Sequence, residues 1–171
     1  KKAYIYVNAI GYFQLYLNGK RIGQDEFAPH VSREDRRTFC ITYDVSNQLK
    51  NGENCIGFWL GRGWSGENGP FLRAQLEIVD DKGESITVIS DESWRARRSY
   101  LSRIGEWRIK RFGGELLDGS LVEPDWPQTG FDDSKWKNVS IAKLADVPVD
   151  AEMMPRNRIV ETINASTVRR L

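Results

Sequence analysis

The stretch 7–23 constrains the fold of this chain more than any other part of the sequence. Between residues 12 and 17, apolar side chains alternate with aromatic and polar ones, which predicts a β-strand with one face toward a core. The inward positions are expected to be Phe13, Leu15 and Leu17. Asn18 and Gly19 follow, and because both tolerate positive φ, they predict a tight type I′ hairpin. The chain therefore opens as antiparallel β-structure.

The remainder of the chain repeats this pattern of short apolar runs separated by turn residues. We expect strands over residues 36–44, 55–60, 71–79, 84–90, 93–96, 158–163 and 167–171. Residues 130–136 are expected to form a short helical turn held by Phe131 and Trp136. No amphipathic helix of three turns is apparent. The sequence therefore predicts an all-β fold, an antiparallel β-sandwich of jelly-roll, galactose-binding-like type.

The length of 171 residues fits one domain with a substantial core. We expect residues 1–145 to form the sandwich, and residues 146–171 to form a linker with exit strands toward the next domain of a longer protein. The chain has no initiator Met and starts within an expected strand, which favours a piece cut from a larger parent. Its compartment is left open, with a periplasmic or secreted parent as one option.

Composition and charge exclude several classes of partner. The 25 basic and 24 acidic residues give a net charge of +1, which favours neither nucleic acid nor an anionic membrane surface. No apolar run is long enough for a membrane span. Cys40 and Cys55 have no metal-ligand spacing. A bridge between neighbouring strands and two buried free thiols are both open to them, and the composition favours the free thiols.

Catalytic chemistry finds little support in the sequence. His30 is the only histidine, and no serine or cysteine nucleophile motif lies near it, so a catalytic triad is disfavoured and a surface histidine is expected. Acidic pairs occur at residues 80–81, 91–92 and 132–133, but adjacency in sequence does not place two carboxylates across a sugar. The glycines of residues 61–66 miss the dinucleotide-binding spacing. We therefore expect no catalytic residue in this chain.

Carbohydrate binding is the better supported chemistry. Sugars stack their C–H faces on aromatic rings while charged and amide groups bind their hydroxyls. The predicted contacts are Arg62, Trp64, Glu67 and Asn68 in a glycine-rich loop, and Trp107 in a second segment. The alternative for Trp64 is that it plugs the end of the core. For the other loop tryptophans, Trp94, Trp126 and Trp136, we expect core or loop anchors rather than ligand contacts.

A calcium site is a further hypothesis for the acidic loop after the first hairpin. Calcium prefers six or more oxygen ligands, and Asp25, Glu26, Glu34 and Asp35 are available. The loop lacks EF-hand spacing, and basic residues are interspersed. A solvated acidic face is therefore the preferred interpretation, with no cofactor and no metal site.

Several blocks of sequence occur in an order that one family shares. They are residues 9–23, 42–45, 49–54, 61–64, 72–76, 90–94, 131–136 and 158–163. In this order they resemble the N-terminal β-sandwich domain of bacterial α-L-rhamnosidases, of the glycoside hydrolase family 78 type, over nearly the whole chain. Two departures are Arg62, where the family often has Asn, and residues 114–120, which lack the Tyr and Arg often found there.

The resemblance implies an accessory β-sandwich beside an (α/α)₆-barrel catalytic domain. In the family the catalytic carboxylates lie on the barrel, so none is assigned to this chain. Some related domains bind L-rhamnose with calcium. Our first hypothesis is therefore a non-catalytic module that assists recognition of rhamnose-containing carbohydrate. A purely structural domain packed against the barrel is the alternative, and an independent hydrolase is disfavoured.

Overall fold

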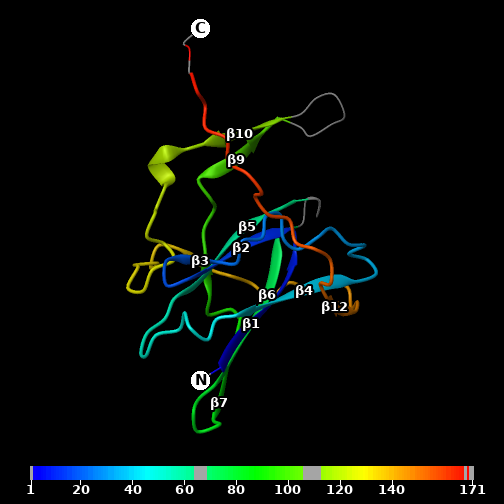
Figure 1. Ribbon diagram of the computed structural model, residues 1–171, viewed down its shortest axis with the longest axis vertical. Helices are drawn as coiled ribbons and strands as arrows, with labels where there is room; N and C mark the ends of the chain where they lie inside the picture. The colour runs from blue at the N-terminus through cyan, green and yellow to red at the C-terminus, as the bar shows by residue number, and fades with distance from the viewer. Residues whose placement is uncertain (1, 64–68, 106–112, 168, 170–171) are drawn as a thin grey trace.

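The computed structural model describes residues 2–63, 69–105, 113–167 and 169, and it confirms the predicted all-β fold. Two sheets of five and three strands enclose the core, and two short two-stranded ribbons accompany them (Figure 1). Within the described residues the only helical element is the 3₁₀ turn η1 (Gly119–Leu121). No helix in this part of the chain has the length and apolarity needed to cross a membrane.

The larger sheet has the strand order β12–β4–β1–β6–β7. Its members are β1 (Lys2–Ile10), β4 (Thr38–Asp44), β6 (Phe71–Val79), β7 (Ser85–Ile89) and β12 (Val149–Ala151). Central β1 pairs along its whole length with β6 and on its other side with β4. All neighbours are antiparallel except β12, which pairs in parallel with β4.

The smaller sheet has the order β3–β2–β5 and contains the predicted opening hairpin. Its members are β2 (Tyr12–Leu17), β3 (Lys20–Ile22) and β5 (Ile56–Gly61). Asn18 and Gly19 have φ of 52° and 81°, so the predicted positive-φ turn is confirmed. The ribbons pair β8 (Arg95–Ala96) with β11 (Lys137–Asn138), and β9 (Leu101–Ile104) with β10 (Gly114–Leu117).

The core lies between the two sheets and follows the period-two pattern of the sequence. From the larger sheet, alternate residues of β1 and β4 point inward, and from the smaller sheet those of β2 do. The buried side chains are Ala3, Ile5, Val7, Ala9, Phe13, Leu15, Leu17, Ile41 and Tyr43. β5 is half-buried rather than fully buried as a continuous apolar run predicts, since it lies at an edge of its sheet. Cys40 and Cys55 are free thiols, as predicted, but both are half-buried.

The C-terminal part differs from the prediction. The expected strand over residues 158–163 is wrong, because these residues have no strand partner in the described part of the chain and therefore no hydrogen-bonded ladder. Of the expected strand over residues 167–171, positions 168, 170 and 171 lie outside the described residues. The segment expected to contain the linker and exit strands supplies β12, three residues that extend the larger sheet beside β4.

Replacing Leu15 by Ala tests the assignment of the core. Leu15 is 1% exposed, so the truncation leaves a cavity and should lower the free energy of unfolding by about 2–5 kcal/mol in urea titration. The matched control is Leu117→Ala in β10, which is 58% exposed and should change this free energy by about 0.5 kcal/mol or less. Equal losses for the two variants would contradict the packing.

Candidate functional site

Most of the sequence-predicted sugar contacts lie outside the described residues. These are Trp64, Glu67, Asn68 and Trp107. Arg62 is described and exposed, directly after the end of β5. The neighbouring Gly63 lies against the ring of Tyr12, where an added Cβ would come within 2.9 Å of ring carbons. The loop therefore leaves β5 close to the start of β2.

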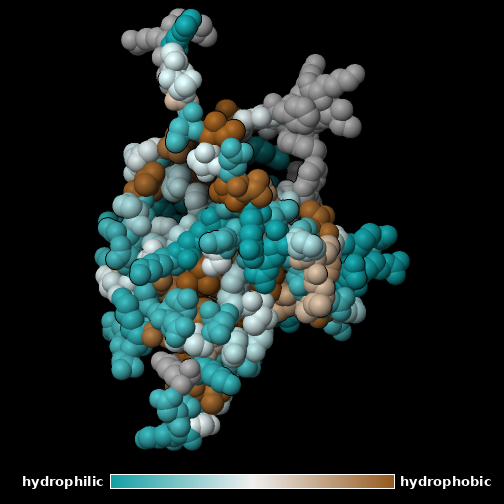
Figure 2. Space-filling view, viewed as in Figure 1, coloured by the Kyte–Doolittle hydropathy of each residue, from teal (hydrophilic) through white to brown (hydrophobic). Residues whose placement is uncertain are grey.

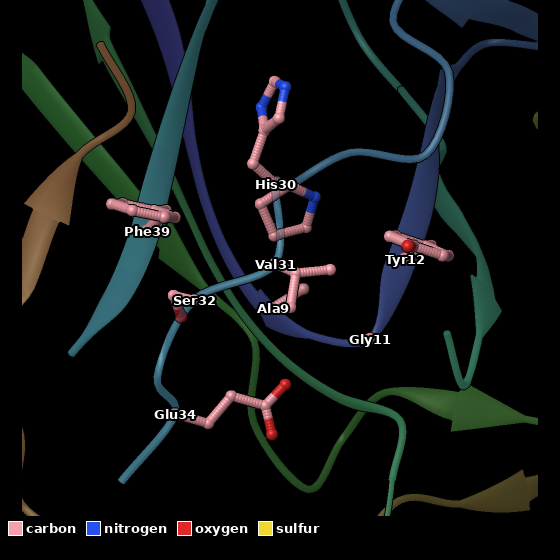
Figure 3. A pocket seen from close by; sticks show the side chains of 9 residues that line it. Ala9, Gly11, Tyr12, His30, Val31, Ser32, Glu34 and Phe39 are labelled. Carbon is pink, nitrogen blue, oxygen red and sulfur yellow. The ribbon is translucent and has the colours of Figure 1, made fainter. Parts of the chain in front are cut away.

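A small cavity lies beside this end of the sandwich (Figure 3). Tyr12, Val31 and Phe39 surround it, and the carboxylate of Glu34 approaches it from the loop before β4. Burial raises the pKa of Glu34 above its usual value. The cavity volume is about 10 Å³, which is the space of one water molecule. It therefore cannot hold a sugar ring.

The buried carboxylate of Asp25 is the centre of a polar cluster that joins three distant parts of the chain. Its Oδ2 accepts hydrogen bonds from Tyr43 Oη at 3.0 Å and from Arg156 Nη1 at 2.7 Å. Asp25 is 6% exposed, and the Arg156 guanidinium lies over the Tyr43 ring, 5.3 Å from its centre. Burial, and next the charge of Asp25, raise the pKa of Tyr43 well above its usual range. The cluster joins residues 131 positions apart in sequence.

A second buried carboxylate, Glu152, holds His30. The side chain of Glu152 is 1% exposed. Its Oε2 accepts a hydrogen bond from the backbone N–H of His30 at 2.9 Å, and its Oε1 lies 3.0 Å from His30 Nδ1. The expected surface histidine is instead partly buried, with 25% of its side chain exposed, because Glu152 packs beside it. Sequence spacing gives no signal for a pair 122 residues apart.

The backbone fastens the same segment. Thr38 N–H donates to Pro148 O at 2.9 Å, Glu152 N–H to Cys40 O at 3.0 Å, and Glu26 N–H to Asn157 O at 2.9 Å. Gly23 makes room for the cluster, since its φ is +80° and an added Cβ would lie 2.7 Å from a Tyr43 ring carbon. We call the Asp25–Tyr43–Arg156 and Glu152–His30 contacts together the exit clasp. It holds residues 148–157 against the sandwich.

Only part of the acidic loop forms the solvated face that the sequence predicts. Asp25 is buried in the exit clasp, and Glu26 accepts a hydrogen bond from Arg21 Nη1 at 2.8 Å. Only Asp35, exposed and paired with Arg33 Nη2 at 2.7 Å, matches that expectation. Within the described ranges, no three His, Cys, Asp or Glu side chains gather in a group that could hold a metal ion.

Apolar side chains gather where the chain leaves the sandwich (Figure 2). We call these residues the exit-end surface. They are Ile104, Leu116 and Leu117 of the β9–β10 ribbon, and Ile159, Val160 and Ile163 of the exit segment, each at least half exposed. Along the long axis of the molecule, the ribbon and the exit segment lie at the same end, opposite β7 (Figure 1). Such a grouping is typical of a surface that packs against further protein.

Two tryptophans that the sequence assigned as anchors stack on each other. The rings of Trp126 and Trp136 are 6.4 Å apart and inclined by 29°. Trp94 stacks on Phe58 of β5 and closes that side of the core, as expected for an anchor. Trp136 differs from Trp94 because it also lines a groove on the surface, which the sequence did not predict.

Comparison with known proteins gives consistent relatives. A family model described as the alpha-L-rhamnosidase N-terminal domain matches residues 1–161. An alpha-L-rhamnosidase of Formosa agariphila is 32% identical over 149 residues, which is 80% of this chain and 16% of that protein. Among solved structures, the alpha-L-rhamnosidase from Dictyoglumus thermophilum is similar with a TM-score of 0.84 and 30% identity, and the match covers 94% of this chain and 18% of that one. The Streptomyces avermitilis alpha-L-rhamnosidase complexed with L-rhamnose has a TM-score of 0.81 and 30% identity, and the match covers 94% of this chain and 16% of that one. The chain thus spans about a sixth of the length of these relatives.

Breaking the exit clasp should destabilise the fold. Arg156→Gln leaves the buried Asp25 carboxylate without its cation, and we expect the free energy of unfolding to fall by about 2 kcal/mol, less than for a fully buried pair because Arg156 is 29% exposed. Arg158→Gln, an exposed neighbour, should change it by about 0.5 kcal/mol or less in the same urea titrations. If both variants behave alike, the pair does not hold the segment.

The Tyr43 hydroxyl should make stability depend on pH in the alkaline range. The unfolded chain loses this proton near its ordinary pKa of 10.0, whereas the folded chain keeps it to higher pH. The stabilisation of the folded state by the protonated Tyr43 hydroxyl is therefore complete below pH 10. Above pH 10 it is lost, by up to about 1.4 kcal/mol per pH unit. Above that pH, the free energy of unfolding should fall more steeply for the wild type than for Tyr43→Phe. Parallel curves would show that the hydroxyl is not held in this way.

Proposed function

The chain belongs to the family of alpha-L-rhamnosidase N-terminal domains, and from this premise we propose that it is a non-catalytic module of an α-L-rhamnosidase-like glycosidase. Its main role is to pack against the rest of the parent chain, which includes the catalytic (α/α)₆ barrel. The parent hydrolyses rhamnosides, and the module supplies no reacting group. The observation that carries this proposal is the exit-end surface, which is apolar and lies where the polypeptide leaves the sandwich.

The exit clasp supports the same role. A docking surface formed partly by a mobile tail would lose conformational entropy on every contact. Here the tail is fixed to the sandwich as far as Asn157 by backbone hydrogen bonds and two buried carboxylates. The apolar residues Ile159, Val160 and Ile163 follow directly. The module therefore presents the start of the following part of the protein in a defined direction.

Recognition of rhamnose-containing glycans is the second candidate function. The specific observation that favours it is the surface groove beside Trp136, whose wall is aromatic and whose rim is charged. The relative from Streptomyces avermitilis that was solved with L-rhamnose gives the sugar class to test. The predicted contacts Arg62, Trp64, Glu67, Asn68 and Trp107 remain proposals for the same role, and calcium as their cofactor is a weaker one.

Docking is tested by placing a charge on the exit-end surface in two contexts. Leu117→Asp should change the free energy of unfolding of the 171-residue chain by about 0.5 kcal/mol or less, because this side chain is 58% exposed. In the parent enzyme the same change buries an unpaired charge, and we expect a loss of about 2 kcal/mol or more.

The matched control for this comparison is Val88→Asp in β7, which is 41% exposed at the opposite end of the molecule. It should have the same effect in both contexts. If Leu117→Asp also acts equally in the chain and in the parent, the exit-end surface is not an interface, and the docking role is wrong.

A further inference from the structure

A groove of about 450 Å³ lies on the described surface beside Trp136. This volume falls within the range of small-molecule sites and exceeds that of the cavity in Figure 3 by more than an order of magnitude. The groove lies between η1 and the turn of residues 131–136. Arg62, the one sequence-predicted sugar contact among the described residues, does not line it.

One wall of the groove is aromatic and rigidly supported. Phe131 meets Trp136 edge to face with ring centres 5.6 Å apart, and Trp126 covers one face of the Trp136 indole. Trp126 in turn packs on Tyr16 of β2 at 5.2 Å, and an added Cβ at Gly57 in β5 would collide with it. The smaller sheet therefore fixes the indole of Trp136, leaving its remaining surface toward the groove.

The opposite side of the groove carries charges suited to hydroxyl groups. Arg97 Nη1 lies 2.5 Å from Glu123 Oε1, while Glu123 Oε2 is buried and receives no hydrogen bond from the described residues. This oxygen has no accessible surface, so the polar contacts that the groove offers to a ligand come from other side chains. Hydrogen bonds from Ser134 lower the pKa of Asp132 below its usual value, so this exposed carboxylate stays ionised as an acceptor. Lys135 adds a donor at the rim.

We propose that this groove is a carbohydrate subsite that holds one deoxyhexose residue of a glycan against Trp136. The C–H face of the pyranose ring stacks on the indole, and its hydroxyls bind the carboxylate of Asp132 and the amine of Lys135. Leu121, 44% exposed at the groove, provides an apolar contact for the methyl group of a 6-deoxy sugar. This inference rests on the second candidate function, glycan recognition, and assigns it to a specific site on the chain.

The chemistry of the groove favours a sugar over a protein segment as its occupant. A docking surface for protein is usually depleted of charge at its centre. Here the charged side chains of Arg97, Asp132 and Lys135 line the groove together with the aromatic wall. The combination of a ring-sized aromatic wall with acceptors and a single amine matches a polyhydroxylated ligand.

Titration of the 171-residue chain with methyl α-L-rhamnoside tests the proposal. The indole N–H signals of the six tryptophans, labelled with ¹⁵N and assigned by Trp→Phe substitution, report on each ring separately. We expect the Trp136 signal, with Trp126 behind it, to shift in a saturable way at millimolar sugar. Sorbitol at the same concentrations controls for a general solvent effect and should shift neither signal.

Variants then place the site. Trp136→Phe keeps an aromatic ring in the stack and should weaken binding at least about threefold, the size of one aromatic contact. Lys135→Ala should weaken binding as well. Its matched control is Lys137→Ala, an exposed lysine of β11 that does not line the groove, which should bind the sugar like the wild type.

Two results would overturn the proposal, and they are distinguishable. In the first, saturable binding shifts other indole signals and is unchanged by Trp136→Phe and Lys135→Ala. This would show that the groove is not the sugar site, while glycan recognition elsewhere in the chain would stand. In the second, no indole signal shifts at tens of millimolar sugar while the chain is folded. This would contradict both the subsite in the groove and glycan recognition by this chain. Neither result bears on the docking role, which the Leu117→Asp comparison tests.

Discussion

The buried carboxylate of Asp25 is the constraint on which the path of the chain depends. It binds Tyr43 of the larger sheet and Arg156 of the exit segment through one oxygen atom. A buried ion pair adds little net stability over an apolar contact, but an unpartnered buried charge is costly, so such a pair selects one arrangement of the chain. In this protein it selects the arrangement in which the exit segment lies along β4. The short parallel strand β12 and the Glu152–His30 contact then follow from that placement.

The local pattern of the sequence predicted the sandwich well, because its strands are specified by alternation and its first turn by two residues that tolerate positive φ. Phe13, Leu15 and Leu17 point into the core as their spacing requires. The exit clasp could not be predicted in this way, since Asp25 and Arg156 are far apart in sequence and each alone reads as a surface charge. The same reason explains why the sequence does not predict strand β12 at residues 149–151 or the contact of His30 with Glu152. For Trp136, the sequence pattern predicts an aromatic residue at a turn, but the groove beside it depends on its packing against Trp126, which the pattern does not show.

The parts of the molecule divide its proposed tasks. The two sheets enclose one apolar core, and the exit clasp fixes the direction in which the chain leaves them. The exit-end surface offers apolar area for the rest of the parent. The aromatic column from Tyr16 through Trp126 to Trp136 carries the rigidity of the smaller sheet to a surface groove. A module of this kind assists a glycosidase without a catalytic group of its own, by holding neighbouring protein and glycan in fixed positions.

Native-state amide hydrogen exchange on the 171-residue chain tests the central claim most directly, namely that the exit segment is fixed as far as Asn157 and free to dock beyond it. The amides of Glu26 and Glu152 donate to backbone carbonyls across the clasp, so they should exchange nearly as slowly as core amides of β1. Residues 158–163 form no strand and should exchange orders of magnitude faster. Fast exchange at Glu26 and Glu152 would contradict the account, because the segment would then leave the sandwich without unfolding it.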